Sequence, residues 1–122
     1  MGVRVAFVDD SPDLLLLYQI NFEGDERFEI VGREQESGHV VDLARAERPD
    51  VVCLDLYLEA ADSLPLIREV KDVVPGTKVI VLSGSVRDEL VLGRALAAGA
   101  DAYVDKLDWV DELKSTILRL AA

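Results

Sequence analysis

The chain has 122 residues, the size of one domain, and half of them are apolar, which argues against disorder. Its formal net charge of −11 disfavours direct binding to nucleic-acid phosphates or to an anionic membrane surface. The single cysteine, Cys53, excludes an internal disulfide, and no transmembrane-length apolar run or signal peptide is found. We therefore expect a soluble cytoplasmic protein.

The first third of the chain predicts a strand, a helix and a second strand. Residues 3–8 form a continuous apolar run, typical of a strand buried on both faces of a parallel sheet. Ser11 followed by Pro12 predicts a helix N-terminus, and this helix should end near Gly24. A weaker and partly polar run, residues 28–31, predicts the second strand.

The middle of the chain repeats the alternation. Ser37 is the expected N-cap of a helix that ends near Arg48, because Pro49 disfavours helical geometry in the residue before it. Residues 51–54 predict the third strand, and the helix after it should stop at the Pro-Gly pair, residues 75–76. The apolar residues of that helix are spaced as one stripe: Leu64, Ile67, Val70 and Val74.

The last third of the chain completes the pattern. Residues 79–82 predict the fourth strand, and Ser85 and Asp88 have capping-box-like spacing for a helix that ends at Gly99. The short run 102–104 predicts the fifth strand. The final helix is predicted from its expected cap and its apolar stripe: Asp108, then Val110, Leu113, Ile117 and Leu120.

Five strands that alternate with five helices predict a parallel sheet with helices on both faces. Right-handed crossovers leave few topologies, and the best fit is a flavodoxin-like three-layer α/β sandwich with strand order 2-1-3-4-5. A closed eightfold barrel would need about twice this length. No linker or repeat divides the sequence, so we expect residues 1–122 to form a single domain.

Polar side chains follow four of the five predicted strands. Because ligands bind beyond the carboxyl ends of parallel strands, near the topological switch point, these side chains should share one edge of the sheet. Asp101 and Asp105 lie in the same region and are interpreted as solvated. The expected site residues, in chain order, are Asp9, Asp10, Asp55, Ser83 and Lys106.

Three clustered carboxylates are unstable together unless they bind protons or a cation. Mg²⁺ prefers oxygen ligands and typically binds through one or two carboxylates plus phosphate oxygens. A nearby lysine can hold an anion, and aspartate is a known nucleophile in phosphoryl transfer. The hypothesis is that Asp9 and Asp10 hold Mg²⁺ and that Asp55 receives a phosphoryl group.

The site residues lie in segments that resemble the receiver domain of two-component response regulators, and the resemblance covers nearly the whole chain. It implies that Asp55 is the phosphorylation site. It also implies that Mg²⁺ is bound by Asp55, by Asp10 directly, by Asp9 through water and by the backbone carbonyl of Tyr57. Lys106 would contact the acyl phosphate. The matching segments are VDDSP (8–12), CLDLYL (53–58), VLSGS (81–85) and AGADAYVDK (98–106).

The same resemblance implies a switch. Ser83 would bond a phosphoryl oxygen after transfer, and Tyr103 would turn inward as Ser83 moves, which shifts the population toward an active packing. The family reads this change at the fourth helix, fifth strand and fifth helix, here about residues 87–120. The implied partners are a histidine kinase or a histidine phosphotransfer protein, with an output domain or a homodimer at the readout surface.

Three residues depart from the family pattern. Leu107 follows Lys106 where many receivers have a cis-proline; a cis peptide before leucine costs about 2.5–4 kcal/mol, so we expect a trans bond. Glu59 and Ser63 stand where proline and glycine are common, so the loop 57–62 is expected to differ in shape and in its response to metal. An unchanged metal affinity and dephosphorylation rate after Glu59→Ala or Glu59→Pro would reject that idea.

The leading hypothesis is a phosphorylatable switch that catalyses only its own phosphorylation and dephosphorylation and turns over no other substrate. Two other functions compete with it. One is a protein-interaction module regulated without phosphorylation, and the intact site residues disfavour it. The other is a haloacid-dehalogenase-type phosphatase, which needs a D-x-D motif where this chain has Asp9 and Asp10 in succession. The chain ends about where a receiver ends, so it is either a stand-alone receiver or part of a longer regulator, with no output domain in these residues.

Overall fold

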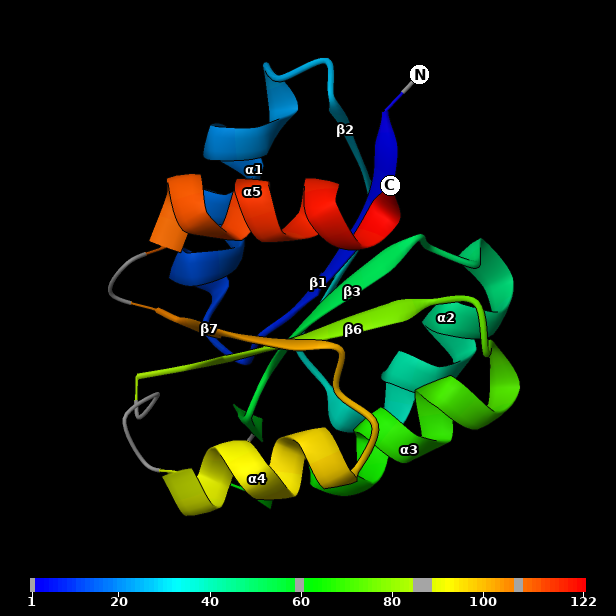
Figure 1. Cartoon of the computed structure of the whole chain (residues 1–122). Coiled ribbons are helices and arrows are strands. Elements are labelled where there is room, and N and C mark those ends of the chain that lie inside the picture. The colour runs from blue at the N-terminus through cyan, green and yellow to red at the C-terminus, as the bar shows by residue number, and fades with distance from the viewer. Residues whose placement is uncertain (1, 59–60, 85–88, 107–108) are drawn as a thin grey trace.

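The protein is seen here in a computed structural model, which describes residues 2–58, 61–84, 89–106 and 109–122 (Figure 1). Five parallel strands form one sheet in the order β2-β1-β3-β6-β7. Since β6 and β7 are the fourth and fifth strands of this sheet, the predicted order 2-1-3-4-5 and the flavodoxin-like fold are confirmed. The strands are β1 (Val3–Val8), β2 (Phe28–Glu34), β3 (Val51–Asp55), β6 (Lys78–Ser83) and β7 (Ala102–Asp105).

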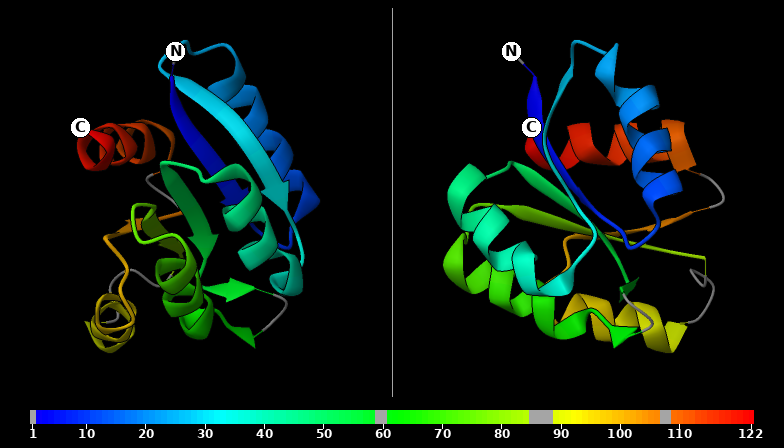
Figure 2. Two further views of the ribbon diagram at one scale, coloured as in Figure 1. Left: turned by 90° about the vertical axis from the view of Figure 1, so that its right-hand side faces the viewer. Right: turned by 180° about the vertical axis from the view of Figure 1, so that it is seen from behind.

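Helices cover both faces of the sheet and make the predicted three layers. Helices α1 and α5 lie on one face, and α2, α3 and α4 lie on the other (Figures 1 and 2). The described part of the chain contains no helix with the length and apolar character needed to cross a membrane. The helices are α1 (Pro12–Glu23), α2 (Val40–Glu47), α3 (Leu64–Val73), α4 (Glu89–Ala97) and α5 (Trp109–Ala121).

The central strands bury both of their faces because successive side chains point to opposite sides of the sheet. On β1, Phe7 packs toward α1 and α5, whereas Val8 packs toward α2, α3 and α4. Phe7 stacks on Tyr18 of α1 with ring centroids 4.7 Å apart. All five residues of β3 are buried. This double burial explains why continuous apolar runs predicted these strands.

Most helix ends follow their sequence signals. The Ser11 hydroxyl accepts a hydrogen bond from the Leu14 N–H at 3.3 Å, and α1 ends before Gly24. Helix α2 ends before Arg48, which has left-handed geometry with a φ of 45°. The turn after α4 contains Gly99 with a φ of 111°, a conformation that glycine adopts without a steric cost.

The predicted cap at Ser37 was wrong. Ser37 opens a short 3-10 turn, η1 (Ser37–His39), and α2 begins only at Val40. His39 occupies the N-cap position of α2 and makes no side-chain cap hydrogen bond. The other predicted caps lie outside the described residues: Ser85, Asp88 and Asp108.

The loop after β3 contains a short antiparallel ladder that the sequence did not predict. Strand β4 (Tyr57–Leu58) pairs with β5 (Ala61–Asp62), and Tyr57 lies opposite Asp62. Glu59 and Leu107 lie outside the described residues, so the expected effect of Glu59 on the loop and the expected trans bond before Leu107 stay predictions.

Asp101 is a structural hydrogen-bond acceptor, so its interpretation as a solvated residue was wrong. Its Oδ2 accepts from the Val79 N–H at 2.8 Å and lies 2.9 Å from the Lys71 ammonium. These contacts tie the turn before β7 to the start of β6 and to α3.

Asp101→Ala is expected to lower the free energy of unfolding by about 1–3 kcal/mol, because the Val79 N–H loses its acceptor in a partly buried place. Urea denaturation would measure this loss. The control is Asp72→Ala on the exposed side of α3, which should change stability by no more than about 0.5 kcal/mol. Equal stability of the two variants would contradict the role given to Asp101.

Candidate functional site

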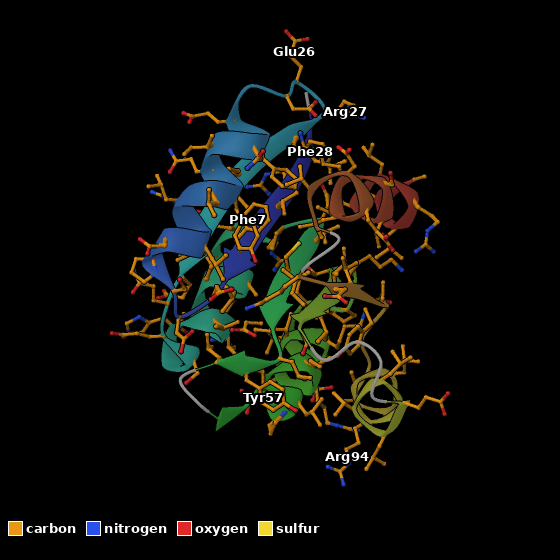
Figure 3. All side chains as sticks on the ribbon, turned by 90° about the vertical axis from the view of Figure 1, so that its left-hand side faces the viewer. Phe7, Glu26, Arg27, Phe28, Tyr57 and Arg94 are labelled. Carbon is orange, nitrogen blue, oxygen red and sulfur yellow. The ribbon has the colours of Figure 1, made fainter. Side chains whose placement is uncertain are left out.

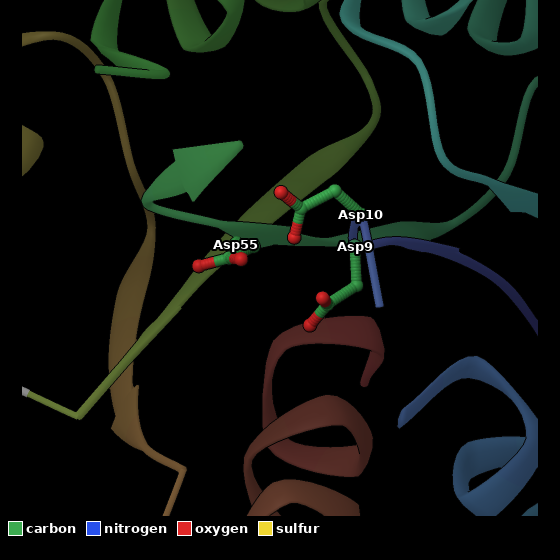
Figure 4. Close-up of side chains that lie close together, drawn as sticks. All are labelled: Asp9, Asp10 and Asp55. Carbon is green, nitrogen blue, oxygen red and sulfur yellow. The ribbon is translucent and has the colours of Figure 1, made fainter. Parts of the chain in front are cut away.

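Three carboxylates meet at the carboxyl edge of the sheet (Figure 4). Asp9 and Asp10 directly follow β1, and Asp55 ends β3, which is paired with β1. Each carboxylate offers an oxygen within 4.8 Å of the others. Asp9 and Asp55 are buried, whereas Asp10 is exposed. The predicted meeting of these three side chains is confirmed.

Lys106 brings a cation to this cluster from the end of β7. Its Nζ lies 3.1 Å from Asp9 Oδ2 and 3.2 Å from Asp55 Oδ2. Its backbone N–H donates to the Ser83 carbonyl at 3.1 Å, which joins the ends of β7 and β6. One ammonium group thus contacts two of the three carboxylates, and the cluster keeps an excess of negative charge that a further cation would offset.

Backbone N–H groups orient the two buried carboxylates. Asp9 Oδ1 accepts from the Ser11 N–H at 3.0 Å, and Asp55 Oδ1 accepts from the Tyr57 N–H at 3.2 Å. In both residues the other oxygen, Oδ2, faces Lys106. The carboxylates are thus held in place before any ligand arrives.

The site shifts the ionisation of its own groups. Burial raises the pKa of Asp55, and the charge of Asp9 acts in the same direction, although the Lys106 ammonium opposes both. Burial works against the charge of Lys106, but Asp9 and Asp55 outweigh it, so the pKa of Lys106 is raised. The lysine therefore stays protonated at neutral pH and can hold an anion.

Ser83 and Tyr103 lie on the same face of the sheet. Ser83 is buried at the end of β6, two residues after Val81, and Val81 pairs with Tyr103 of β7. Tyr103 packs against the core beneath α3 and α4, and its hydroxyl oxygen is shielded from solvent. Both predicted switch residues therefore lie on the sheet face that α2, α3 and α4 cover.

Tyr57 lies beside the cluster in the chain but directs much of its side chain outward. The side chain is at the end of the molecule opposite the turn that carries Glu26 and Arg27 (Figure 3). Tyr57 is 47% exposed. Tyr57 therefore contributes to the site through its backbone, whose N–H donates a hydrogen bond to Asp55 Oδ1.

Tyr18 is a neighbour of the site that the sequence analysis did not identify. It is buried on α1, and its pKa is raised by burial and by the charge of Asp9, with a side-chain hydrogen bond to Asp9 as a further cause. A tyrosine among the leucines of α1 looks like an ordinary core residue, so the sequence contains no signal for this contact.

Ser63 holds the backbone at the site, a role that the sequence did not predict. The sequence analysis noted this residue only because it departs from the family pattern. Its buried hydroxyl donates to the Asp55 carbonyl at 2.7 Å and accepts from the Leu58 N–H at 3.2 Å. A serine between an aspartate and a helix looks like an N-cap, but Ser63 makes no side-chain cap bond to α3.

The donor set fits a divalent metal ion. Carboxylate oxygens are hard ligands, and three of them converge within a space that one cation can bridge. The adjacent ammonium group suits a phosphate or another anion beside that cation. The acidic cluster could therefore hold a metal ion, with the Lys106 ammonium beside it.

Comparisons with known proteins agree with this site. The profile of the response regulator receiver domain matches residues 5–118. The response regulator protein VraR of Staphylococcus epidermidis is 26% identical over 117 residues, which are 96% of this chain and 56% of that protein. The chain therefore spans little more than half the length of this relative.

Two solved structures share the fold. The response regulator domain of Thermotoga maritima CheB superposes with a TM-score of 0.90 at 20% identity and covers 99% of this chain and 97% of that one. A LuxR-family DNA-binding response regulator from Staphylococcus aureus gives a TM-score of 0.87 at 22% identity. The superposition covers 98% of this chain and 99% of that one. These structures show the shared fold, and the family match over residues 5–118 makes the assignment: this chain belongs to the response regulator receiver domains, the phosphoacceptor modules of two-component signalling.

Proposed function

We propose that Asp55 accepts a phosphoryl group from a phosphohistidine of a histidine kinase or phosphotransfer protein, in a reaction that depends on Mg²⁺. The observation that carries this proposal is the environment of Asp55. Its carboxylate ends a buried strand, lies 3.2 Å from a lysine ammonium and shares a space of 4.8 Å with two further carboxylates. Asp9 is also buried and also contacts Lys106, so the resemblance of residues 53–58 to the phosphoacceptor segment of the family is what selects Asp55 over Asp9.

The metal ligands in this proposal are Asp9, Asp10, Asp55 and the backbone carbonyl of Tyr57. The Ser63 N–H donates to the Leu56 carbonyl, a bond that flanks the ladder pair of Tyr57 with Asp62. In such a pair the N–H and C=O of each residue point away from the partner strand. The Tyr57 N–H donates to the Asp55 carboxylate, and the Tyr57 carbonyl leaves the strand on the same side. This direction supports the Tyr57 carbonyl as a metal ligand.

In the transfer step a carboxylate oxygen of Asp55 attacks phosphorus, and the P–N bond of the donor breaks with its electron pair leaving on the imidazole. When bound, Mg²⁺ supplies positive charge that offsets the repulsion between the carboxylate and the anionic donor. Lys106 is placed to hold a phosphoryl oxygen, because its ammonium already contacts Asp55. The Tyr57 N–H keeps the Asp55 carboxylate oriented during the attack.

After transfer, the phosphoryl group biases the switch. Ser83 bonds a phosphoryl oxygen, Tyr103 turns inward, and the face formed by α4, β7 and α5 changes its packing. Leu90 and Leu96 on α4 are large apolar side chains that are exposed, which supports a partner at this face. That partner is an output domain or a second copy of the chain. The whole of residues 1–122 acts as one receiver domain in the cytoplasm.

Intact-mass spectrometry tests the proposal. Incubation with Mg²⁺ and acetyl phosphate should add one phosphoryl group to the protein, and neither a chelated sample nor Asp55→Asn should gain it. Asp72→Asn, which neutralises an exposed acid on α3, should be modified like the wild type. No addition to the wild type would instead favour a protein-interaction module that works without phosphorylation.

A further inference from the structure

A buried serine hydroxyl holds the turn that carries Asp55. Ser63 is 2% exposed, and its Oγ lies between two backbone groups of that turn. It donates to the Asp55 carbonyl at 2.7 Å and accepts from the Leu58 N–H at 3.2 Å. The Ser63 N–H also donates to the Leu56 carbonyl at 2.8 Å. One residue thus binds the backbone on both sides of Tyr57.

The side chain of Tyr57 adds little to the restraints on its backbone, which are the N–H bond to Asp55, the ladder pairing with Asp62 and the bonds of Ser63. The Tyr57 side chain is 47% exposed, so side-chain packing orients it only weakly. Its neighbours Leu56 and Leu58 are each 2% exposed and are the residues whose backbone Ser63 holds. The direction of the Tyr57 carbonyl is therefore set mainly by the bonds on either side of it.

Loss of the hydroxyl would loosen this turn. The Asp55 carbonyl would lose a donor in a buried place, and the Leu58 N–H would lose one acceptor and keep only its ladder pairing with Ala61. Buried polar groups without partners are costly, so the backbone would shift to recover hydrogen bonds. Residues 55–58, which contain two of the proposed metal ligands, form the segment that would move.

We propose that Ser63 is a positioning residue for metal binding: its hydroxyl holds residues 55–58 so that the Asp55 carboxylate and the Tyr57 carbonyl face one cation together. Groups that orient metal ligands in this way typically contribute about 10–100-fold to affinity. The inference rests on the proposed function, because that function assigns the ligand roles to Asp55 and Tyr57.

Calorimetric titration of the metal-free protein with Mg²⁺ provides the test. Ser63→Ala should raise the Kd for Mg²⁺ by about tenfold, and Ser63→Thr, which keeps the hydroxyl, should restore most of the affinity. The matched control is Thr77→Ala, which lies just before β6, at the end of that strand away from the acidic cluster. Thr77 is 1% exposed and its hydroxyl donates to the Pro49 carbonyl at 2.7 Å, so it loses a bond of equal length without touching the site.

The control should lower the unfolding midpoint as Ser63→Ala does, while its Kd for Mg²⁺ stays at the wild-type value. An unchanged Kd in folded Ser63→Ala, or an equal loss of affinity in Thr77→Ala, would overturn the proposal. If Ser63→Ala does not fold, Ser63→Gly, which also removes the hydroxyl, takes its place: its Kd for Mg²⁺ should rise by about tenfold, and a wild-type Kd would overturn the proposal.

The two proposals can fail separately. A wild-type protein in which Asp55 is never phosphorylated rejects the proposed function. A phosphorylated wild type whose Ser63→Ala variant binds Mg²⁺ normally rejects only the positioning role of Ser63.

Discussion

Asp10→Asn is expected to lower the affinity for Mg²⁺ by at least about 100-fold. A unit charge about 4 Å from a unit cation is worth about 4 kcal/mol at an effective dielectric constant of about 20, and about 1.4 kcal/mol corresponds to a tenfold change in affinity. Asparagine keeps the shape of the side chain but removes its charge from the cluster. Calorimetric titration of the metal-free variant measures the effect.

The same substitution should stabilise the protein when no metal is present. Three carboxylates within 4.8 Å repel one another, and removing the charge of Asp10 relieves part of that repulsion. The unfolding midpoint in urea with a chelator should therefore rise. Asp13→Asn is the control, because Asp13 is an exposed acid in the first turn of α1 outside the cluster. Wild-type Mg²⁺ affinity in Asp10→Asn would contradict the assigned metal site.

Lys106→Gln is expected to abolish phosphoryl transfer and to lower the free energy of unfolding of the metal-free protein by about 2–3 kcal/mol. Removing one partner of a buried ion pair leaves the other charges uncompensated, and the partial exposure of the lysine places this loss below the roughly 3–5 kcal/mol usual for a fully buried pair. Urea denaturation at neutral pH with a chelator measures the stability, and intact-mass spectrometry measures the transfer.

This destabilisation should depend on pH. The raised pKa of Lys106 means that its stabilising charge is present below the ordinary lysine pKa, about 10.4, and is lost as the pH rises through the raised value. The raised pKa of Asp55 acts in the same direction at acid pH: stability falls as the pH rises from about 4 through the raised value, because the native state holds the proton longer.

Without Lys106 the pKa of Asp55 should rise further, since the ammonium is the main group that lowers it. The stability difference between wild type and Lys106→Gln should therefore shrink as the pH falls toward about 4 and Asp55 becomes protonated. Lys78→Gln, at the far end of β6, is the control and should show no such trend. A constant difference across this pH range would contradict the proposed electrostatic coupling.

The central strands could be predicted closely because they are covered on both faces. The bounds of β1 are the residues of its apolar run, and β3 and β6 extend theirs by one or two residues. Strand β2 runs three residues beyond its prediction, to Glu34. It is an edge strand with polar residues, and its register against β1 shifts between Val5 and Ala6, so it has no clean apolar pattern.

The meeting of Asp9, Asp55 and Lys106 could also be predicted, because parallel strands deliver their ends to one edge of the sheet. The ladder of β4 with β5 could not, since strands of two residues show no periodicity. Nor could the contacts of Ser63 and Tyr18, which depend on how a loop and a helix pack around the cluster. Topology thus predicts the groups that carry the chemistry but not the groups that hold them in place.

The location of the phosphoryl group tests the central claim most directly. An acyl phosphate is reduced by borohydride, which converts a phosphorylated aspartate to homoserine, and tandem mass spectrometry then identifies the modified position. After incubation with Mg²⁺ and acetyl phosphate, we predict homoserine at position 55 and at no other aspartate. Homoserine at position 9 or 10 in place of 55, or none in a protein that binds Mg²⁺, would contradict the assignment of Asp55 as the phosphoacceptor.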